Sequence, residues 1–496
     1  MKLYVTLFSV LLAASAWGQQ AETVLTYNVE TSATVSNGKY APVWLSSNRF
    51  GMGSVENNNG YLRAGINFEK ILNHNWKIES GFQMASGFNV NSNFWIQQAY
   101  ADFSWKMLNI SIGAKERMGF PLEKNSRLTT GWMTEGINTR PIPQIRGEIK
   151  DFLEIPGLKG WLALKGHIAY GKFMDSKWQE NFVKPGSTYT KGTMYHSKSI
   201  LFRLGNKNKL PLDFEFGIIM ATQFAGDRMK LNADGSSELL IDMPDDLGAY
   251  WSAFLPQKGG SDTSEYEQYN VEGNMLGSWN FALNYYWGEW KFRMHLDHYF
   301  EDHSQMFWEY GRWKDGQLGL EITPKKNKFI SGISIELMST KDQTGPIQYE
   351  ENWGSLTGMQ TSGCDNYYNH YMYNAWQHYG MGMGNPLIPS PAYNDNKTIS
   401  FLSNRVETVH LGMEGDPDKE WKWRLLITSS KYWGTYAAPL DKVRKHFSSL
   451  AEVSYRPEKL KGWSFTIAGA VDNGNYLGNS TGGMIIVKKE GLLWKK

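Results

Sequence analysis

A histidine and two carboxylates lie at strand spacing near the middle of the chain. His295, Asp297 and Glu301 fall on one face of the segment 290–301, in which apolar and polar residues alternate. Residues i and i+2 of a strand are about 7 Å apart, so His295 and Asp297 could form the pair that orients a nucleophile. No serine in a strained glycine-flanked turn accompanies them, and such pairs are more often ion pairs. The sequence therefore predicts a protein that is not an enzyme.

A run of aromatic residues indicates a different chemistry in the segment 364–386, CDNYYNHYMYNAWQHYGMGMGNP. Aromatic faces stack on sugar rings, while amides and carboxylates bond to sugar hydroxyls, and long loops without structure of their own are usually functional. The candidate glycan-binding residues are Tyr367, Tyr368, Tyr371, Tyr373, Trp376 and Tyr379. The alternative is that these rings pack on one another as a plug, and one segment could do both.

Metal and cofactor chemistry find little support in the sequence. Cys364 is the only cysteine, which excludes an intrachain disulfide and a zinc site built from thiolates. The oxygen-rich run Asn394-Asp395-Asn396 lacks the spacing of a calcium loop. We therefore predict no metal site and no cofactor.

The segment 277–301 shows which elements must hold these residues. Apolar residues alternate with polar ones on both sides of the turn-forming dipeptide Gly288-Glu289, as in a hairpin whose strands each have one apolar and one polar face. Each strand runs ten or more residues, whereas strands of soluble proteins are usually about 5–6 residues long. Tryptophan or tyrosine lies near both ends of the apolar face, as in strands that cross a membrane. The hairpin is typical of a transmembrane β-barrel.

The same pattern recurs along the chain and predicts about 18 strands. Short turns are expected at 71–75, 106–107, 153–160, 206–211, 288–289, 324–328, 416–420 and 457–462. Long outside loops are expected at about 118–143, 172–194, 226–268 and 341–403. Short periplasmic turns that alternate with long outside loops are characteristic of outer-membrane barrels. The predicted fold class is all-β, an antiparallel transmembrane barrel with both ends of the chain in the periplasm.

On this interpretation the charged faces of the strands line the lumen. The predicted lumen-lining residues are Asp102, Lys115, Arg117, Lys165, His167, Lys291, Arg293, His295 and Asp297. A barrel of about 18 strands is wide enough for an aqueous channel, so these residues could select a charged solute. The alternative, which we favour, is that opposite charges pair across neighbouring strands and hold the shape of the barrel.

The start of the chain and its composition agree with export to the outer membrane. Residues 1–18 combine Lys2, an apolar stretch and small residues, and are predicted to be a cleaved signal peptide. Residues 19–496 then form a single barrel domain in contact with outer-membrane lipid. Aromatic residues make up 14% of the chain, which fits interfacial girdles, and the net charge of +2 argues against a nucleic-acid partner.

Several segments together resemble the Wzi-type capsule assembly proteins of Bacteroidetes. The similar segments are YAPVWLSSNRFG (40–51), NNGYLRAG (58–65), FWIQQAYADF (94–103), ISIGAKER (110–117), RPIPQIR (140–146), GWLALKGHIAYGKF (160–173), YHSKSILFRLG (195–205) and GGMIIVKKEGLLW (482–494). They span essentially the whole mature chain, and their shared order carries the resemblance.

The resemblance implies an outer-membrane barrel of about 18 strands that attaches or organises capsular polysaccharide or exopolysaccharide at the cell surface. The behaviour it implies is lectin-like and non-catalytic. It assigns no binding residues to this chain. The alternative function is a channel for glycans or small charged solutes across the outer membrane.

Overall fold

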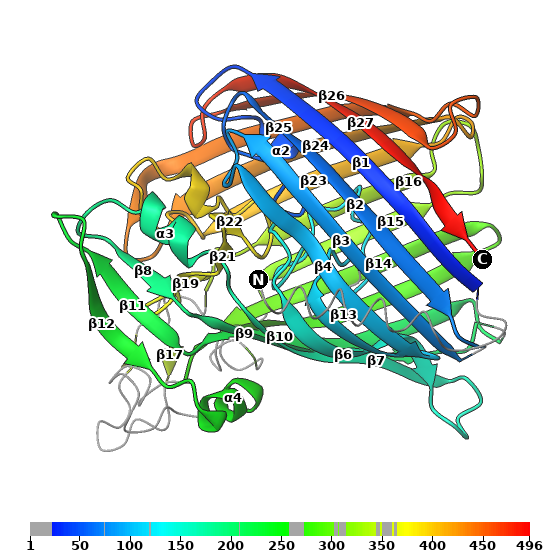
Figure 1. The fold of residues 1–496 in the computed structure, drawn as a ribbon, viewed down its shortest axis with the longest axis horizontal. Helices are drawn as coiled ribbons and strands as arrows, with labels where there is room; N and C mark the ends of the chain where they lie inside the picture. Colours follow the sequence, from blue (N-terminus) through cyan, green and yellow to red (C-terminus); the bar gives the residue numbers. More distant parts are fainter. Residues whose placement is uncertain are drawn as a thin grey trace.

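Eighteen long strands form one closed antiparallel sheet (Figure 1). The computed structural model describes residues 22–496 except 74, 119–120, 208, 257–271, 302–305, 307–313, 344–347, 350–359 and 362–364. The barrel strands are β1 (Glu22–Ser36), β2 (Asn59–Ile71), β3 (Trp76–Phe88), β4 (Phe94–Trp105), β5 (Leu108–Ala114), β6 (Gln144–Glu154), β7 (Leu162–Lys172), β9 (Met194–Leu204), β10 (Leu212–Phe224), β13 (Asn274–Trp287), β14 (Trp290–Glu301), β15 (Gly316–Thr323), β16 (Gly332–Ser339), β23 (Val406–Gly415), β24 (Trp421–Gly434), β25 (Pro439–Tyr455), β26 (Trp463–Gly474) and β27 (Ser480–Lys495). Pairing of β1 with β27 closes the barrel, which confirms the predicted fold class.

The alternation of side chains decides which face of each strand meets the lumen. In β13, Ser278, Asn280 and Asn284 are buried inside, whereas Tyr285 and Trp287, which come just before the turn, are exposed. Gly288 adopts φ +59° in the two-residue turn to β14, a conformation that glycine reaches without strain. The strands therefore present their polar faces inward and their apolar faces outward.

A ring of exposed tryptophans surrounds one end of the barrel. Each member lies at or beside a strand end that adjoins a short turn or the end of the chain: Trp76, Trp105, Trp161, Trp287, Trp290, Trp421, Trp463 and Trp494. Tryptophan is enriched where barrel strands cross the lipid–water interface. The ring thus marks the short-turn end as one edge of the apolar belt.

Connections differ in length between the two ends of the barrel. At the end where β1 begins and β27 ends, the connections are short, as at 106–107, 288–289 and 416–420. At the opposite end, which we call the mouth, the connections include residues 37–58, 115–143 and 340–405. The eight short turns predicted from the sequence all fall at the first end.

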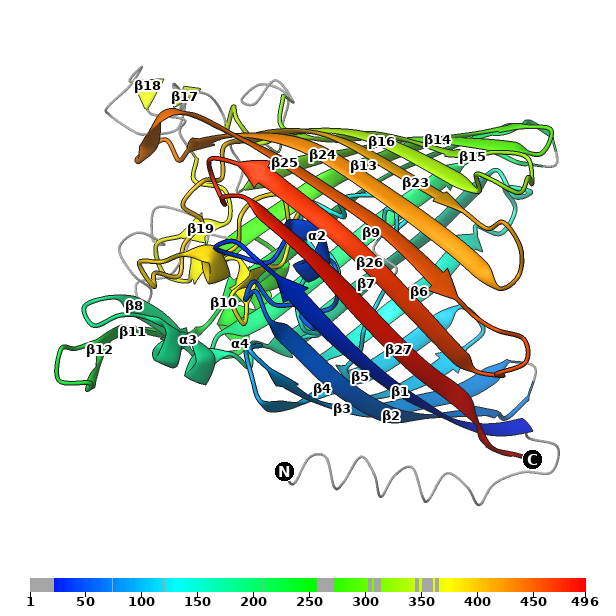
Figure 2. The same ribbon diagram turned by 90° about the horizontal axis from the view of Figure 1, so that it is seen from above.

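Three of the mouth connections fold back into the lumen. We call residues 37–58, 121–143 and 365–405 the plug. The plug contains the one-turn helix α2 (Val43–Ser46), which lies inside the ring of strands (Figure 2). Its largest buried side chains include Trp44, Trp132 and Trp376, which are 4% exposed or less. Segments expected as outside loops therefore contribute to the interior of the molecule.

Smaller elements surround the mouth (Figure 1). A three-stranded sheet consists of β8 (Thr188–Lys191), β11 (Gly226–Leu231) and β12 (Ser237–Met243), beside the helices α3 (Ser176–Phe182) and α4 (Leu247–Phe254). The connection 340–405 adds the short strands β17 (Gln348–Tyr349), β18 (Gln360–Thr361), β19 (Asn369–His370), β20 (Asn374–Ala375), β21 (Gln377–His378) and β22 (Met381–Gly382), and the 3-10 turn η3 (Pro391–Tyr393). Among the residues described, no helix has the length and apolar character to cross a membrane.

Candidate functional site

A cavity of about 620 Å³ opens among the mouth connections. We call it the mouth pocket. Its lining combines amides, charged groups and rings, and these come from several segments of the chain. They include Arg228, Asn274, Glu301, Asp365, Asn366, Asn369, His370, Tyr371, Asn374 and Phe401. A concave site that combines a few ring faces with fixed hydrogen-bonding groups is suited to a small polar ligand.

Buried tyrosines hold the floor of the mouth pocket in place. Tyr299 of β14 packs edge-on against Tyr367 and Tyr368, with ring centroids 4.8 and 5.2 Å apart. The Tyr367 hydroxyl donates to Asp315 at 3.2 Å, and the Tyr368 hydroxyl donates to the carbonyl of Met133. These rings tie the connection 340–405 to the barrel wall and to the second plug segment.

The backbone around the pocket adopts conformations that L-residues rarely take. Tyr368, Asn374 and Tyr379 have φ values of +65°, +61° and +54°. Asparagine tolerates this region, but tyrosine does so only when its surroundings enforce it. Such strain clusters at ligand-binding sites because the fold must over-determine the position of the functional groups.

The asparagine side chains of the pocket are oriented by neighbours rather than free to rotate. Asn369 donates to Asn366 Oδ1 and to the Phe401 carbonyl, both at 2.9 Å, and accepts from Phe401 N at 2.7 Å. Asn374 Oδ1 accepts from the Thr188 hydroxyl at 2.9 Å. Asn274 Nδ2 donates to Gln223 at 2.8 Å. Fixed amides of this kind can distinguish one arrangement of ligand hydroxyls from another.

A cation–π pair forms one side of the pocket. The Arg228 guanidinium carbon lies 4.4 Å from the centre of the Tyr371 ring. Arg228 Nε is buried and has no hydrogen-bond acceptor among the described residues. Burial lowers the pKa of Arg228, and it lowers the pKa of His370 to about 3. His370 is therefore neutral at physiological pH and adds no second positive charge to the pocket. Because Arg228 Nε has no acceptor in the described structure, it offers an unsatisfied charged donor to a ligand.

The predicted glycan-binding residues separate into two groups. Four of them have 1% of their surface exposed or less and pack inside the plug: Tyr367, Tyr368, Tyr373 and Trp376. Tyr371 is 52% exposed and lines the mouth pocket. Tyr379 is half-buried, and its hydroxyl donates to the Met174 carbonyl at 2.9 Å. The burial of the first group is the packing that the plug alternative describes, while Tyr371 retains an accessible ring.

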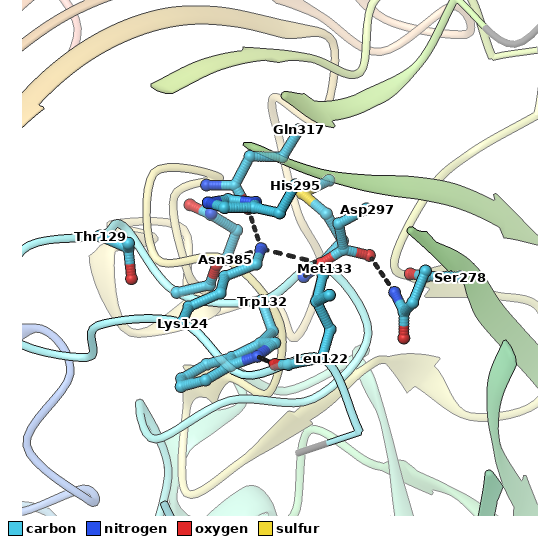
Figure 3. Close-up of polar contacts among 12 residues, drawn as sticks. Leu122, Lys124, Thr129, Trp132, Met133, Ser278, His295, Asp297, Gln317 and Asn385 are labelled. Atoms are coloured by element: carbon cyan, nitrogen blue, oxygen red, sulfur yellow. Dashed lines mark hydrogen bonds and ion pairs between the residues drawn. The ribbon is translucent and has the colours of Figure 1, made fainter. Parts of the chain in front are cut away.

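Deep in the lumen, Lys124 from the plug joins Asp297 of β14 (Figure 3). Lys124 Nζ lies 3.1 Å from the Asp297 carboxylate, 2.6 Å from Gln317 Oε1 and 2.9 Å from the Gly131 carbonyl. Asp297 also accepts from Met133 N at 3.0 Å and from Asn280 at 3.2 Å. Asp297 is thus committed to this buried ion pair.

His295 belongs to the same network but not to a His–Asp pair. Its Nε2 lies 3.5 Å from Glu321 on the adjacent strand β15 and 3.8 Å from Glu336 on β16, one strand further. Asp297 has both oxygens engaged by Lys124, Met133 and Asn280. Glu301 accepts from the Tyr299 hydroxyl at 2.5 Å. Asp297 and Glu301 therefore have structural partners, whereas neither ring nitrogen of His295 has a hydrogen-bond partner among the described residues.

The other predicted lumen residues also face inward, and their partners come from both strands and plug. Asp102 binds Lys115 at 2.6 Å, and Arg293 binds Glu215 across β13 at 2.9 Å. Lys165 instead binds Glu123 of the mouth connection at 2.6 Å. The remaining members lie as follows: Arg117 donates to Ser111 at 2.7 Å, His167 contacts Ser197 at 2.8 Å, and Lys291 is half-buried on the face of Arg293.

Comparison with known proteins bears on the fold. No family model matches the sequence, and no curated protein matches it. The structure is similar to that of Wzi, an outer-membrane protein involved in group 1 capsule assembly in Escherichia coli and a carbohydrate-binding β-barrel. The two are 12% identical over 93% of this chain and 83% of that chain, with a TM-score of 0.53. The likeness is one of fold.

Two structures from Pseudomonas aeruginosa align over a similar length. OccK5 (OpdH) is 7% identical over 95% of this chain and 99% of its own, with a TM-score of 0.48. OpdQ is 8% identical over 97% of this chain and 100% of its own, with a TM-score of 0.47.

Sequence reasoning did not single out most residues of the mouth pocket. Arg228 and Asn274 lie at the two ends of a connection that the sequence shows only as long and polar. Asn366, Asn369 and Asn374 are part of the aromatic run, where the sequence shows them only as polar residues between the tyrosines. That spacing is the one sequence feature that could have indicated their place in the pocket.

Proposed function

We propose that this protein is an outer-membrane barrel that binds capsular polysaccharide or a related exopolysaccharide in its mouth pocket. It attaches or organises this polymer at the cell surface without chemical turnover. The observation that carries the proposal is the pocket itself, in which fixed amides, the Arg228 cation and the Tyr371 ring line one cavity of about 620 Å³. A cavity of this size accommodates a few sugar residues.

The chemistry of the pocket matches that of a glycan. Sugar hydroxyls need both donors and acceptors at fixed positions, which the oriented asparagine amides supply. Tyr371 offers a ring face, and Arg228 Nε offers a charged donor that would bond to a hydroxyl or to the carboxylate of an acidic sugar. The location at the long-loop end places these groups toward the cell exterior in the proposed orientation.

The plug favours this function over the alternative of a channel. The plug segments bury large rings and bond to the inner faces of the strands, as at Lys124 and Asp297. Opening a path for a glycan would expose these rings and break buried ion pairs, which costs several kcal/mol (about 3–5 for one pair). We expect the purified protein to show no steady conductance in a planar bilayer.

The proposal is tested by binding of purified protein to a panel of neutral and acidic polysaccharides. We expect Tyr371→Ala and Arg228→Gln each to weaken binding by about tenfold, because each removes a stacking face or a charged donor. Trp251→Ala is the matched control, since Trp251 is a 55% exposed ring on α4 outside the pocket lining. Equal loss in all three variants, or no binding by the unmodified protein, would contradict the proposal.

The same variants test the role in the cell. A strain without the protein should still synthesise polymer but shed more of it into the medium. The unmodified protein and the Trp251→Ala variant should restore retention, whereas Tyr371→Ala should not. If the deletion strain retains as much polymer as the parent strain, the attachment role is contradicted, while the binding result still stands.

A further inference from the structure

A second cavity, of about 300 Å³, lies on the other side of the plug. Its lower wall includes Ser464 at the start of β26 and Arg456 just after β25, both at the short-turn end. Its upper wall is the plug, through Trp44, Arg49 and Thr129. The cavity therefore faces the end of the barrel opposite the mouth pocket.

Cationic groups dominate the charged lining of this cavity, which we call the arginine chamber. Its charged members are Arg49, Arg127, Arg424, Arg456, Lys488, Glu30 and Glu452. Glu30 is already bound by Arg63 at 3.1 Å, and Arg63 does not line the chamber. Glu452 accepts from Arg424 at 2.7 Å and lies 3.6 Å from Arg127. The chamber thus has few carboxylates for its cations.

Not all of these cations are available to a ligand. Arg127 also binds Glu414 at 2.9 Å, and Lys488 binds Glu490 at 2.6 Å. The structure gives no ion pair to Arg49 or Arg456 within the ranges it describes. Arg456 is exposed at the lower rim, whereas Arg49 points from the plug. Arg49 is therefore the inner cation of the chamber without a direct ion pair in the described structure, and it shares the Glu452 carboxylate only at longer range.

Two guanidinium N–H donors in this wall lack acceptors. Arg49 Nε and Arg424 Nε are both buried without a hydrogen-bond partner in the described structure. A buried donor left unsatisfied costs about 1–3 kcal/mol, and more when it is charged. Serine and threonine hydroxyls, including those of Ser47, Ser126 and Thr466, line the same cavity. An oxygen-rich anion would satisfy the guanidinium donors and accept from these hydroxyls.

The backbone that presents Arg49 is held in an unusual shape. The neighbouring residues Asn48 and Phe50 have φ values of +55° and +52°. Asn48 N donates to Asn138 Oδ1 at 3.0 Å, and Phe50 N donates to the Ile137 carbonyl at 2.6 Å. Positive φ at phenylalanine is uncommon, and such strain is retained where surrounding bonds fix a functional group. The plug thus presents Arg49 to the chamber in one orientation.

We infer that the arginine chamber is a binding site for an oxyanion, such as a phosphate group or the carboxylate of an acidic sugar, that enters from the short-turn end. Arg49 is the main contact, supported by Arg424 and approached past Arg456 at the rim. This site is separate from the mouth pocket, because the plug lies between them. It does not depend on the function proposed for the mouth pocket.

The inference is tested by calorimetric titration of the purified full-length protein at pH 7 and constant ionic strength. The probes are inorganic phosphate, glucuronate and uncharged glucose. We expect heat from phosphate or glucuronate and none from glucose, and the more tightly bound anion identifies the source of the ligand. Arg49→Gln should weaken binding by about tenfold or more, as expected when a charged hydrogen-bond partner is removed.

Lys39→Gln is the matched control, since it makes the same charge change in the same connection but pairs with Asp395 at the outer surface. It should leave anion binding unchanged. Arg49→Lys, which keeps the charge but loses the fork of donors, should bind with intermediate affinity and guards against loss of folding in the glutamine variant. Equal affinity in the unmodified protein and Arg49→Gln, binding of glucose as tight as glucuronate, or no heat with either anion would overturn the inference.

Discussion

The outer and inner parts of the plug are held by different forces. The outer part, residues 365–405, buries rings such as Trp376 and Tyr368 mainly against other rings, including Tyr195 of β9 and Tyr299 of β14. The inner part, residues 121–143, bonds through Lys124 to charged and amide groups of the strands. The reason lies in the wall. Most inward side chains of the wall are polar, so a plug segment that touches them must supply polar partners, whereas inward rings near the mouth such as Tyr299 allow aromatic packing.

The largest effect should come from removing the central ring of the outer part. Trp376 is fully buried and its Nε1 donates to the Thr134 carbonyl at 2.8 Å. Trp376→Ala should destabilise the plug by about 4 kcal/mol, through the cavity and the lost hydrogen bond. Limited proteolysis of the connection 340–405 measures the loss. The exposed Trp251→Ala should change cleavage little, and equal cleavage in both variants would contradict the aromatic half of the comparison.

A slightly smaller effect is expected from the inner part. Lys124→Met leaves the buried Asp297 carboxylate without its cation, which should cost about 3 kcal/mol. A second change, Asp297→Asn, should recover most of that loss because the remaining groups are then neutral. Plug openings in planar-bilayer recordings report the effect. If the double variant opens as often as Lys124→Met, the ion pair does not hold the inner part.

Sequence patterns captured the wall much better than the plug. The period-two alternation and the turn residues placed the strands, because both signals are local along the chain. β25 begins earlier than expected, at Pro439 rather than His446, through a register shift beside Gly434. Lys124 and Asp297 are far apart in sequence. Lys124 lies in a loop without periodicity, so no local pattern predicts that it pairs with Asp297. The sequence could therefore identify Asp297 as lumenal but not its partner.

The site residues show the same limit. The tyrosine-rich run was visible as a chemical composition, but which rings pack inward depends on contacts with Met133, Thr134 and Tyr299 from other segments. Arg49 belongs to a stretch without strand or helix periodicity. Its significance depends on the plug fold and on the charges of β24 and β25 across the chamber.

The smallest effect is a response of the outer part to acid. Burial lowers the pKa values of His370 and His378, and His378 Nε2 accepts from Met174 N while Nδ1 donates to the Arg140 carbonyl. In the unfolded segment the two histidines have a pKa of about 6.5 and become protonated below that pH. In the folded segment burial keeps them neutral at the same pH. Stability is therefore full above that pH and falls by up to about 1.4 kcal/mol per pH unit per histidine below it.

Proteolysis of the connection 340–405 at pH 7.5 and pH 5.5 measures this response. We expect faster cleavage at pH 5.5, and a smaller difference between the two pH values in His378→Gln. A pH-independent rate in the unmodified protein would show that the histidines bind protons equally in the folded and unfolded segment, and would remove them from the comparison.

The pairing of β1 with β27 sets the order in which the molecule can form. Every other neighbouring pair in the wall is joined by a connection that begins and ends on those two strands, so each hairpin can form once its own stretch of chain is present. The seam instead joins residues such as Val24 and Lys495, nearly the full chain apart. Contacts of such long sequence separation form late, since closing the intervening loop costs entropy before any bond is gained. Until then both edge strands expose unpaired backbone, so the last steps of assembly are those most open to a folding catalyst or to aggregation.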